Sequence, residues 1–168
     1  MLITDESFFA IVQDTWTSTL GFQVNRAERE ELAALEALTV GARISGAWDG
    51  EVRLHCSPEL ARLIAAAIFQ VDADKAGREE ILDALSELIH IVGGNLKPLL
   101  PQPVNLWLPS LPDPTHRAQT APQWQRVCRL TLISEGHPFA VSLLGDPPPT
   151  SESATPADLE GRRSAETP

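Results

Sequence analysis

The chain has 168 residues, of which 43% are hydrophobic and 21% charged, and this composition is typical of a single globular domain with a real core. Its formal net charge is -10, which argues against nucleic acid and anionic membrane surfaces as partners, because binding phosphate needs clustered Lys and Arg. No signal peptide or membrane-spanning stretch is evident, so we expect a cytoplasmic protein. Cys56 and Cys128 are too few for a disulfide framework and are expected to be buried free thiols.

The N-terminal third is predicted to hold two helices and a hairpin. Apolar residues at helical spacing indicate a helix over 5–20, with Thr4 or Asp5 as its cap. Residues 25–38 are rich in Glu, Ala and Leu, which favours a second helix with a narrow apolar face. Alternating residues over 40–56 predict a hairpin, in which Asp49-Gly50 is expected to form a tight two-residue turn.

The middle of the chain is predicted to contain two further helices. Ser57-Pro58-Glu59 has the residues of a helix start, and that helix should run to about Gln70. A longer central helix is expected from Arg78 to about Lys97, where Pro98 stops it.

Strands are predicted over 104–108, 127–133 and 139–144, the last two joined around Glu135-Gly136, with an irregular proline-rich segment over 109–123. The order of strands and helices predicts an α+β domain over 1–145, in which an antiparallel sheet is flanked by long helices. Residues 146–168 are expected to form a disordered acidic tail rich in Pro, Ser and Thr, because they cannot bury enough apolar area.

The remaining aromatic and metal-ligating residues give no site by themselves. The tryptophans are scattered, and Trp124 is expected to be the most exposed of them. His55, His116 and His137 lack the spacing of zinc ligands and are expected at the surface. We therefore predict no metal site.

The central helix has two different faces. Ile81, Leu85, Leu88 and Val92 form an apolar stripe, whereas Glu80, Asp83, Glu87, His90 and Gly94 share the opposite side. Glu87 and His90 should therefore be neighbours that face outward. An ordinary solvated pair on a helix surface would give the same pattern.

Gly93 and Gly94 lie in the last turns of this helix, where each costs about 1 kcal/mol relative to alanine. A close backbone approach would compensate, either from internal packing or from a docked partner. The next residue, Asn95, could serve as a C-terminal cap of the helix.

The run over 81–97, followed by 98–109 with Leu108-Pro109 at its end, resembles the CheX branch of the CheC/CheX/FliY phosphatases. In that family a long helix carries Glu-x-x-Asn, then a pair of small residues and a second Asn. The resemblance implies dephosphorylation of a chemotaxis response regulator, a CheY-like receiver domain. The amide orients water for attack on the aspartyl phosphate, and the glutamate pairs with a lysine of the receiver.

The resemblance also implies which residues of this chain act. Glu87 matches the family glutamate, and His90 stands where the family has asparagine; these two are the predicted catalytic residues. Asp83, Gly94 and Asn95 are predicted to bind the partner, and Asn95 is expected to have a structural role as well. Histidine could still orient the water or take its proton.

We predict no cofactor for this chain, because the resemblance implies that the receiver supplies Mg²⁺. The departure at His90 also leaves an alternative function, a catalytically silent module that binds a receiver or another chemotaxis component. Glu87-x-x-His90 matches half of a di-iron site, but the chain has no second copy of that pattern. A homodimer formed through sheet edges is possible, as in CheX proteins.

Overall fold

The computed structural model describes residues 3–27, 38–109 and 124–146. The helices are α1 (Asp5–Leu20), α2 (Pro58–Phe69) and α3 (Arg78–Leu96), with short 3-10 helices η2 (Ala73–Lys75) and η3 (Lys97–Leu99). The strands are β1 (Asn25–Arg26), β2 (Leu38–Gly46), β3 (Gly50–Cys56), β4 (Val104–Leu106), β5 (Gln125–Ser134) and β6 (His137–Gly145). This is the predicted α+β architecture.

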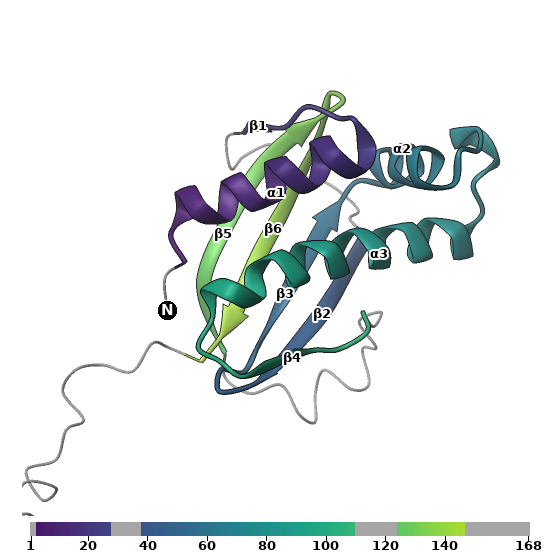
Figure 1. Cartoon of the computed structure of the whole chain (residues 1–168). Coiled ribbons are helices and arrows are strands. Elements are labelled where there is room, and N and C mark those ends of the chain that lie inside the picture. The colour runs from purple at the N-terminus through teal and green to yellow at the C-terminus, as the bar shows by residue number, and fades with distance from the viewer. Residues whose placement is uncertain (1–2, 28–37, 110–123, 147–168) are drawn as a thin grey trace, which may run out of the picture.

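Across the described ranges the strands form one antiparallel sheet in the order β1-β5-β6-β3-β2-β4. Helices α1 and α3 lie over the same face of it, with α1 above β5 and β6 and α3 above β2 and β3, and α2 packs against α3 near the end of β3 (Figure 1). Alternate residues of β3 are buried because they point toward the helices, as the predicted period of two requires. The core therefore lies between one sheet face and the helix layer.

Large side chains from distant parts of the chain fill this core. Trp16 of α1 stacks on Phe139 of β6, with ring centroids 4.7 Å apart. Both are fully buried, and stacked aromatic pairs add to the free energy gained from burial alone. This contact fixes α1 over the sheet.

The predicted starts of the first two long helices are confirmed. The Thr4 hydroxyl accepts from the Ser7 N–H at 3.2 Å, and the Ser57 hydroxyl accepts from the Leu60 N–H at 3.1 Å. These side chains satisfy N–H groups that have no partner within the helix. The predicted turn between the last two strands is also confirmed, with Glu135 at φ 51° and Gly136 at φ 77°.

The predicted helix over 25–38 is wrong at both described ends. Asn25 and Arg26 form β1, which pairs with β5, and Leu38 already begins β2. Arg26 also pairs with Glu6 at 3.0 Å and lies over the Phe9 ring at 4.6 Å. These tertiary contacts outweigh local helix propensity; residues 28–37 lie outside the described part of the chain.

The predicted two-residue turn at Asp49-Gly50 is also wrong. The last β2–β3 pair is Ile44 with Gly50, and the end of β2 continues beyond it to pair with β4. A Cβ on Gly50 would lie 2.2 Å from the ring of Trp48. The indole N–H of Trp48 donates to the Asp146 carbonyl, which holds the ring in this place. Gly50 therefore makes room for Trp48 instead of forming the turn.

The prediction for the most exposed tryptophan is wrong as well. Trp107, just beyond β4, is 58% exposed, whereas Trp124 is half-buried beneath the Arg43 guanidinium. A cation over an aromatic ring covers it and adds electrostatic attraction.

Both cysteines are buried free thiols, as predicted. Burial raises the pKa of Cys56 to about 12. Burial and a hydrogen bond to the Asp5 carboxylate raise the pKa of Cys128 to about 12. The predicted tail beyond residue 146, the segment over 110–123 and His116 lie outside the described residues.

Candidate functional site

Helix α3 carries the predicted site on the side away from the sheet. Its inner stripe includes Leu85, Leu88 and Val92, all fully buried, while Asp83 and Glu87 are exposed on the outer side. The helix contacts α1, α2, β2 and β3, so its outer face is carried by a segment fixed on several sides (Figure 1). Side chains on such an element are placed more precisely than those on a loop.

His90 lies one turn after Glu87 and is half-buried. Its Nδ1 is fully buried and has no hydrogen-bond partner. The other ring nitrogen, Nε2, keeps contact with solvent and is likewise not held by any hydrogen bond within the described residues. The imidazole thus rests on the protein through its Nδ1 side and presents Nε2 outward.

The two glycines of α3 have different surroundings. A Cβ on Gly93 would come within 2.8 Å of Leu106 and 3.4 Å of Val52, so the helix backbone packs directly on β3 and β4 there. A Cβ on Gly94 would meet nothing within 4 Å, and Gly94 is exposed. Internal packing therefore explains Gly93 but not Gly94.

Asn95 connects two helices. Its side-chain N–H donates to the Thr15 hydroxyl of α1 at 3.3 Å, and that buried hydroxyl donates in turn to the Ile11 carbonyl. The alternative role as a helix cap is wrong, because α3 continues through Asn95 and its last turn passes into η3. Asn95 holds α1 and α3 together at the end of the candidate site.

The outer face of α3 is strongly acidic. Glu79, Asp83 and Glu87 follow each other at intervals of four residues, and all three are exposed. Among the described residues no cation forms an ion pair with any of them. Like charges at this spacing destabilise a helix slightly, and no cation among the described residues offsets them.

The other histidines and acidic residues form no metal centre in the described ranges, where no cluster of three or more potential ligands occurs. His55 is instead hydrogen-bonded to the Thr39 hydroxyl on the sheet. In the same ranges, none of the helices has the length and apolar character needed to cross a membrane.

Comparison with known proteins adds a family match to this geometry. The profile of the family described as "Chemotaxis phosphatase CheX" matches residues 38–129, which include β2, β3, α2, α3 and β4. No sequence match is found among curated proteins.

Solved structures share the fold at low sequence identity. The chemotaxis protein CheX from Vibrio vulnificus is 13% identical, with a TM-score of 0.65 over 84% of this chain and 95% of that one. The CheX–CheY–BeF3–Mg²⁺ complex from Borrelia burgdorferi contains a chain that is 14% identical, with a TM-score of 0.63 over 88% of this chain and all of that one. CheX from Desulfovibrio desulfuricans is 13% identical, with a TM-score of 0.64 over 84% and 97% of the two chains.

Proposed function

Because this chain belongs to the CheX chemotaxis phosphatase family, we propose that it dephosphorylates a CheY-like receiver domain through the outer face of α3. The observation that carries this proposal is the placement of Glu87 and His90, one turn apart, with Glu87 and the His90 Nε2 open to solvent. The similar Borrelia burgdorferi protein was crystallised with CheY, BeF3 and Mg²⁺, which supports a receiver as the partner.

In the proposed reaction, water attacks the phosphorus of the receiver's aspartyl phosphate. The bond from phosphorus to the aspartyl oxygen breaks, which releases inorganic phosphate and restores the carboxylate. The receiver contributes the aspartate and its Mg²⁺, whereas this chain contributes position and hydrogen bonds. Glu87 pairs with a lysine of the receiver, and the acidic row through Asp83 extends this contact.

The buried, unpartnered Nδ1 of His90 determines which hydrogen bonds the ring can form with a receiver. A buried N–H without an acceptor costs about 1–3 kcal/mol, and such groups are rarer than unpaired acceptors. The tautomer with its proton on Nε2 avoids a proton on the unpartnered Nδ1. His90 then presents a donor, which suits a phosphoryl oxygen, whereas accepting a proton from the attacking water requires the costlier tautomer.

This constraint favours a second candidate function, a module that binds the receiver without rapid turnover. An amide at position 90 would offer a donor and an acceptor together, and it would have no ring nitrogen to bury. The two functions share the same docking face and differ only in the rate of phosphate release.

The test measures phosphate release by a CheY-type receiver supplied with acetyl phosphate and Mg²⁺. We expect wild-type protein to accelerate release at least about tenfold and Glu87→Gln to lose most of that effect. His90→Asn should be faster than wild type by about 5- to 150-fold, which is the conversion of about 1–3 kcal/mol. Glu135→Gln is the matched control for charge, because Glu135 is exposed in the turn between β5 and β6, outside α3.

Different outcomes separate the two functions. Binding without acceleration, with activity gained in His90→Asn, would assign the silent module. A wild-type protein that neither binds nor accelerates any of several CheY-type receivers would reject both functions.

We also propose that two copies can associate through a sheet edge. Within the described residues β2 pairs with β4 only from Ile44 to Gly46, so the preceding part of β2 has no strand beside it on that side. Exposed strand edges of this kind can pair with another chain. Light scattering tests the association, and a monomer mass at all concentrations would contradict it.

A further inference from the structure

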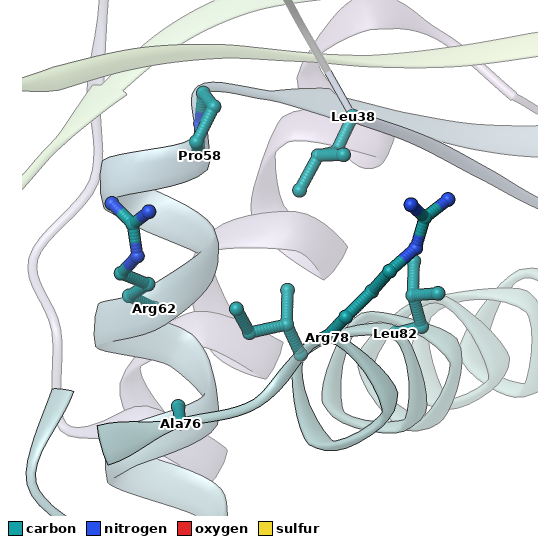
Figure 2. A pocket seen from close by; sticks show the side chains of 7 residues that line it. Leu38, Pro58, Arg62, Ala76, Arg78 and Leu82 are labelled. Carbon is teal, nitrogen blue, oxygen red and sulfur yellow. The ribbon is translucent and has the colours of Figure 1, made fainter. Parts of the chain in front are cut away.

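A cavity of about 260 Å³ opens on the opposite side of α3 from Glu87 and His90, between the first turns of α2 and α3. Its walls are formed by Leu38, Pro58, Arg62, Ala76, Arg78, Ile81 and Leu82. Figure 2 shows the apolar side chains toward its centre and the two guanidinium groups on opposite sides. These residues come from three separate parts of the chain.

Both arginines of the cavity are exposed and lack partners. Within the described residues no hydrogen bond or ion pair engages Arg62 or Arg78. This is unusual in a chain with a formal charge of -10, where acidic side chains outnumber basic ones by 23 to 13. The cavity therefore combines an apolar interior with a positively charged rim.

The volume decides which kind of occupant fits. Pockets for small organic ligands are commonly about 300–1,000 Å³ and enclose most of the ligand. The volume of about 260 Å³ is below that range, and its mouth is open between exposed arginines. One or two apolar side chains of a polypeptide would fill it, with carboxylates on either side reaching the guanidinium groups. Arginine is common at the centres of protein interfaces, because it pairs with carboxylates in a bidentate manner.

We propose that this cavity docks a short segment of a partner protein in which an apolar anchor is flanked by Asp or Glu. The anchor enters between α2 and α3, and its acidic neighbours pair with Arg62 and Arg78. This surface is separate from the outer face of α3, so a partner bound here leaves Glu87 and His90 accessible.

The test uses a fluorescein-labelled peptide of sequence EEDLFDEE and fluorescence anisotropy at low ionic strength. We expect saturable binding with a Kd on the order of 100 µM, weakened by added salt. Arg62→Glu and Arg78→Glu should each weaken binding at least about fivefold, because each replaces attraction by repulsion. Arg126→Glu is the matched control for charge, since Arg126 is exposed on β5 away from the cavity; it should change binding less than about twofold.

Two further measurements separate the apolar contribution from simple attraction between charges. The peptide EEDSSDEE keeps every acid but lacks the anchor and should bind at least about fivefold more weakly. Ala76→Phe adds a ring to the wall of the cavity while it keeps both arginines, and it should exclude EEDLFDEE. Thermal unfolding of this variant verifies that it remains folded.

The proposal is overturned if EEDLFDEE does not saturate, if EEDSSDEE binds equally well, or if Arg126→Glu weakens binding as much as Arg62→Glu. Octanoate that competes with the peptide at comparable concentration would assign the cavity to small amphipathic acids instead.

Discussion

Gly94 is a position where a substitution should stabilise the protein and impair its activity. A glycine inside a helix is about 1 kcal/mol less favourable than alanine, because its backbone loses more freedom on folding. A Cβ at Gly94 would meet no atom within 4 Å, so nothing in the fold opposes the methyl group. The helix ends two residues later, at Leu96, where fraying reduces the gain.

We therefore expect Gly94→Ala to raise the free energy of unfolding by about 0.5–1 kcal/mol, which corresponds to a rise in Tm of about 1–4 °C. If a receiver approaches the α3 backbone at this point, the added methyl group should slow receiver dephosphorylation at least about fivefold. Urea unfolding followed by tryptophan fluorescence measures the first effect, and phosphate release from the receiver measures the second.

Gly93→Ala is the internal comparison. Its methyl group would lie 2.8 Å from Leu106 and must displace it, so the gain from helix propensity should be lost. A Gly94→Ala protein that is no more stable than wild type would contradict the open environment of this residue. A protein that is more stable but equally active would refute the idea that a partner requires the glycine.

Two predictions concern stability alone. The Cys56 pKa of about 12 lies above its ordinary value of 9.0. Between these two pH values the folded state keeps the thiol proton that the unfolded state loses. The free energy of unfolding should therefore fall as the pH rises from about 9 to 12. Wild type should lose about 1.4 kcal/mol more than Cys56→Ala between pH 8 and pH 10 in urea unfolding, and equal losses would contradict this. Asn95→Ala and Thr15→Val should each cost about 1 kcal/mol, because each removes one side of the same hydrogen bond. The double variant should cost less than the sum by about 0.5 kcal/mol or more, and simple additivity would show that the contact contributes nothing.

Most of the fold could be predicted from local signals in the sequence. Helix α1 has the predicted bounds and is capped by Thr4, while α2 and α3 end within a residue of their predicted ends. These signals are short-range: apolar spacing, a capping hydroxyl and a proline. The error at Asn25–Arg26 arose because this strand exists through its contacts with β5 and α1, which no local pattern encodes.

The site could be predicted in outline only. Helical spacing predicts Glu87 on the outer side of α3, where it lies, and the family resemblance indicates His90 as a site residue. The buried Nδ1 of His90 could not be predicted, because it depends on how neighbouring elements surround the ring. The cavity between Arg62 and Arg78 was missed for a similar reason, since its walls come from segments that are not adjacent in sequence.

At the consecutive glycines, Gly93 and Gly94, α3 has no side chain toward the sheet or toward solvent. Beneath Gly93 the backbone rests on Leu106 and Val52, and at Gly94 the neighbouring backbone is bare toward solvent. At this level only the backbone of α3, with no α3 side chain, lies between the side chains of β3 and β4 and the outer surface. A bulkier residue at position 52 should push the helix outward at this level. A substitution inside the protein would then alter the surface that we propose meets a receiver.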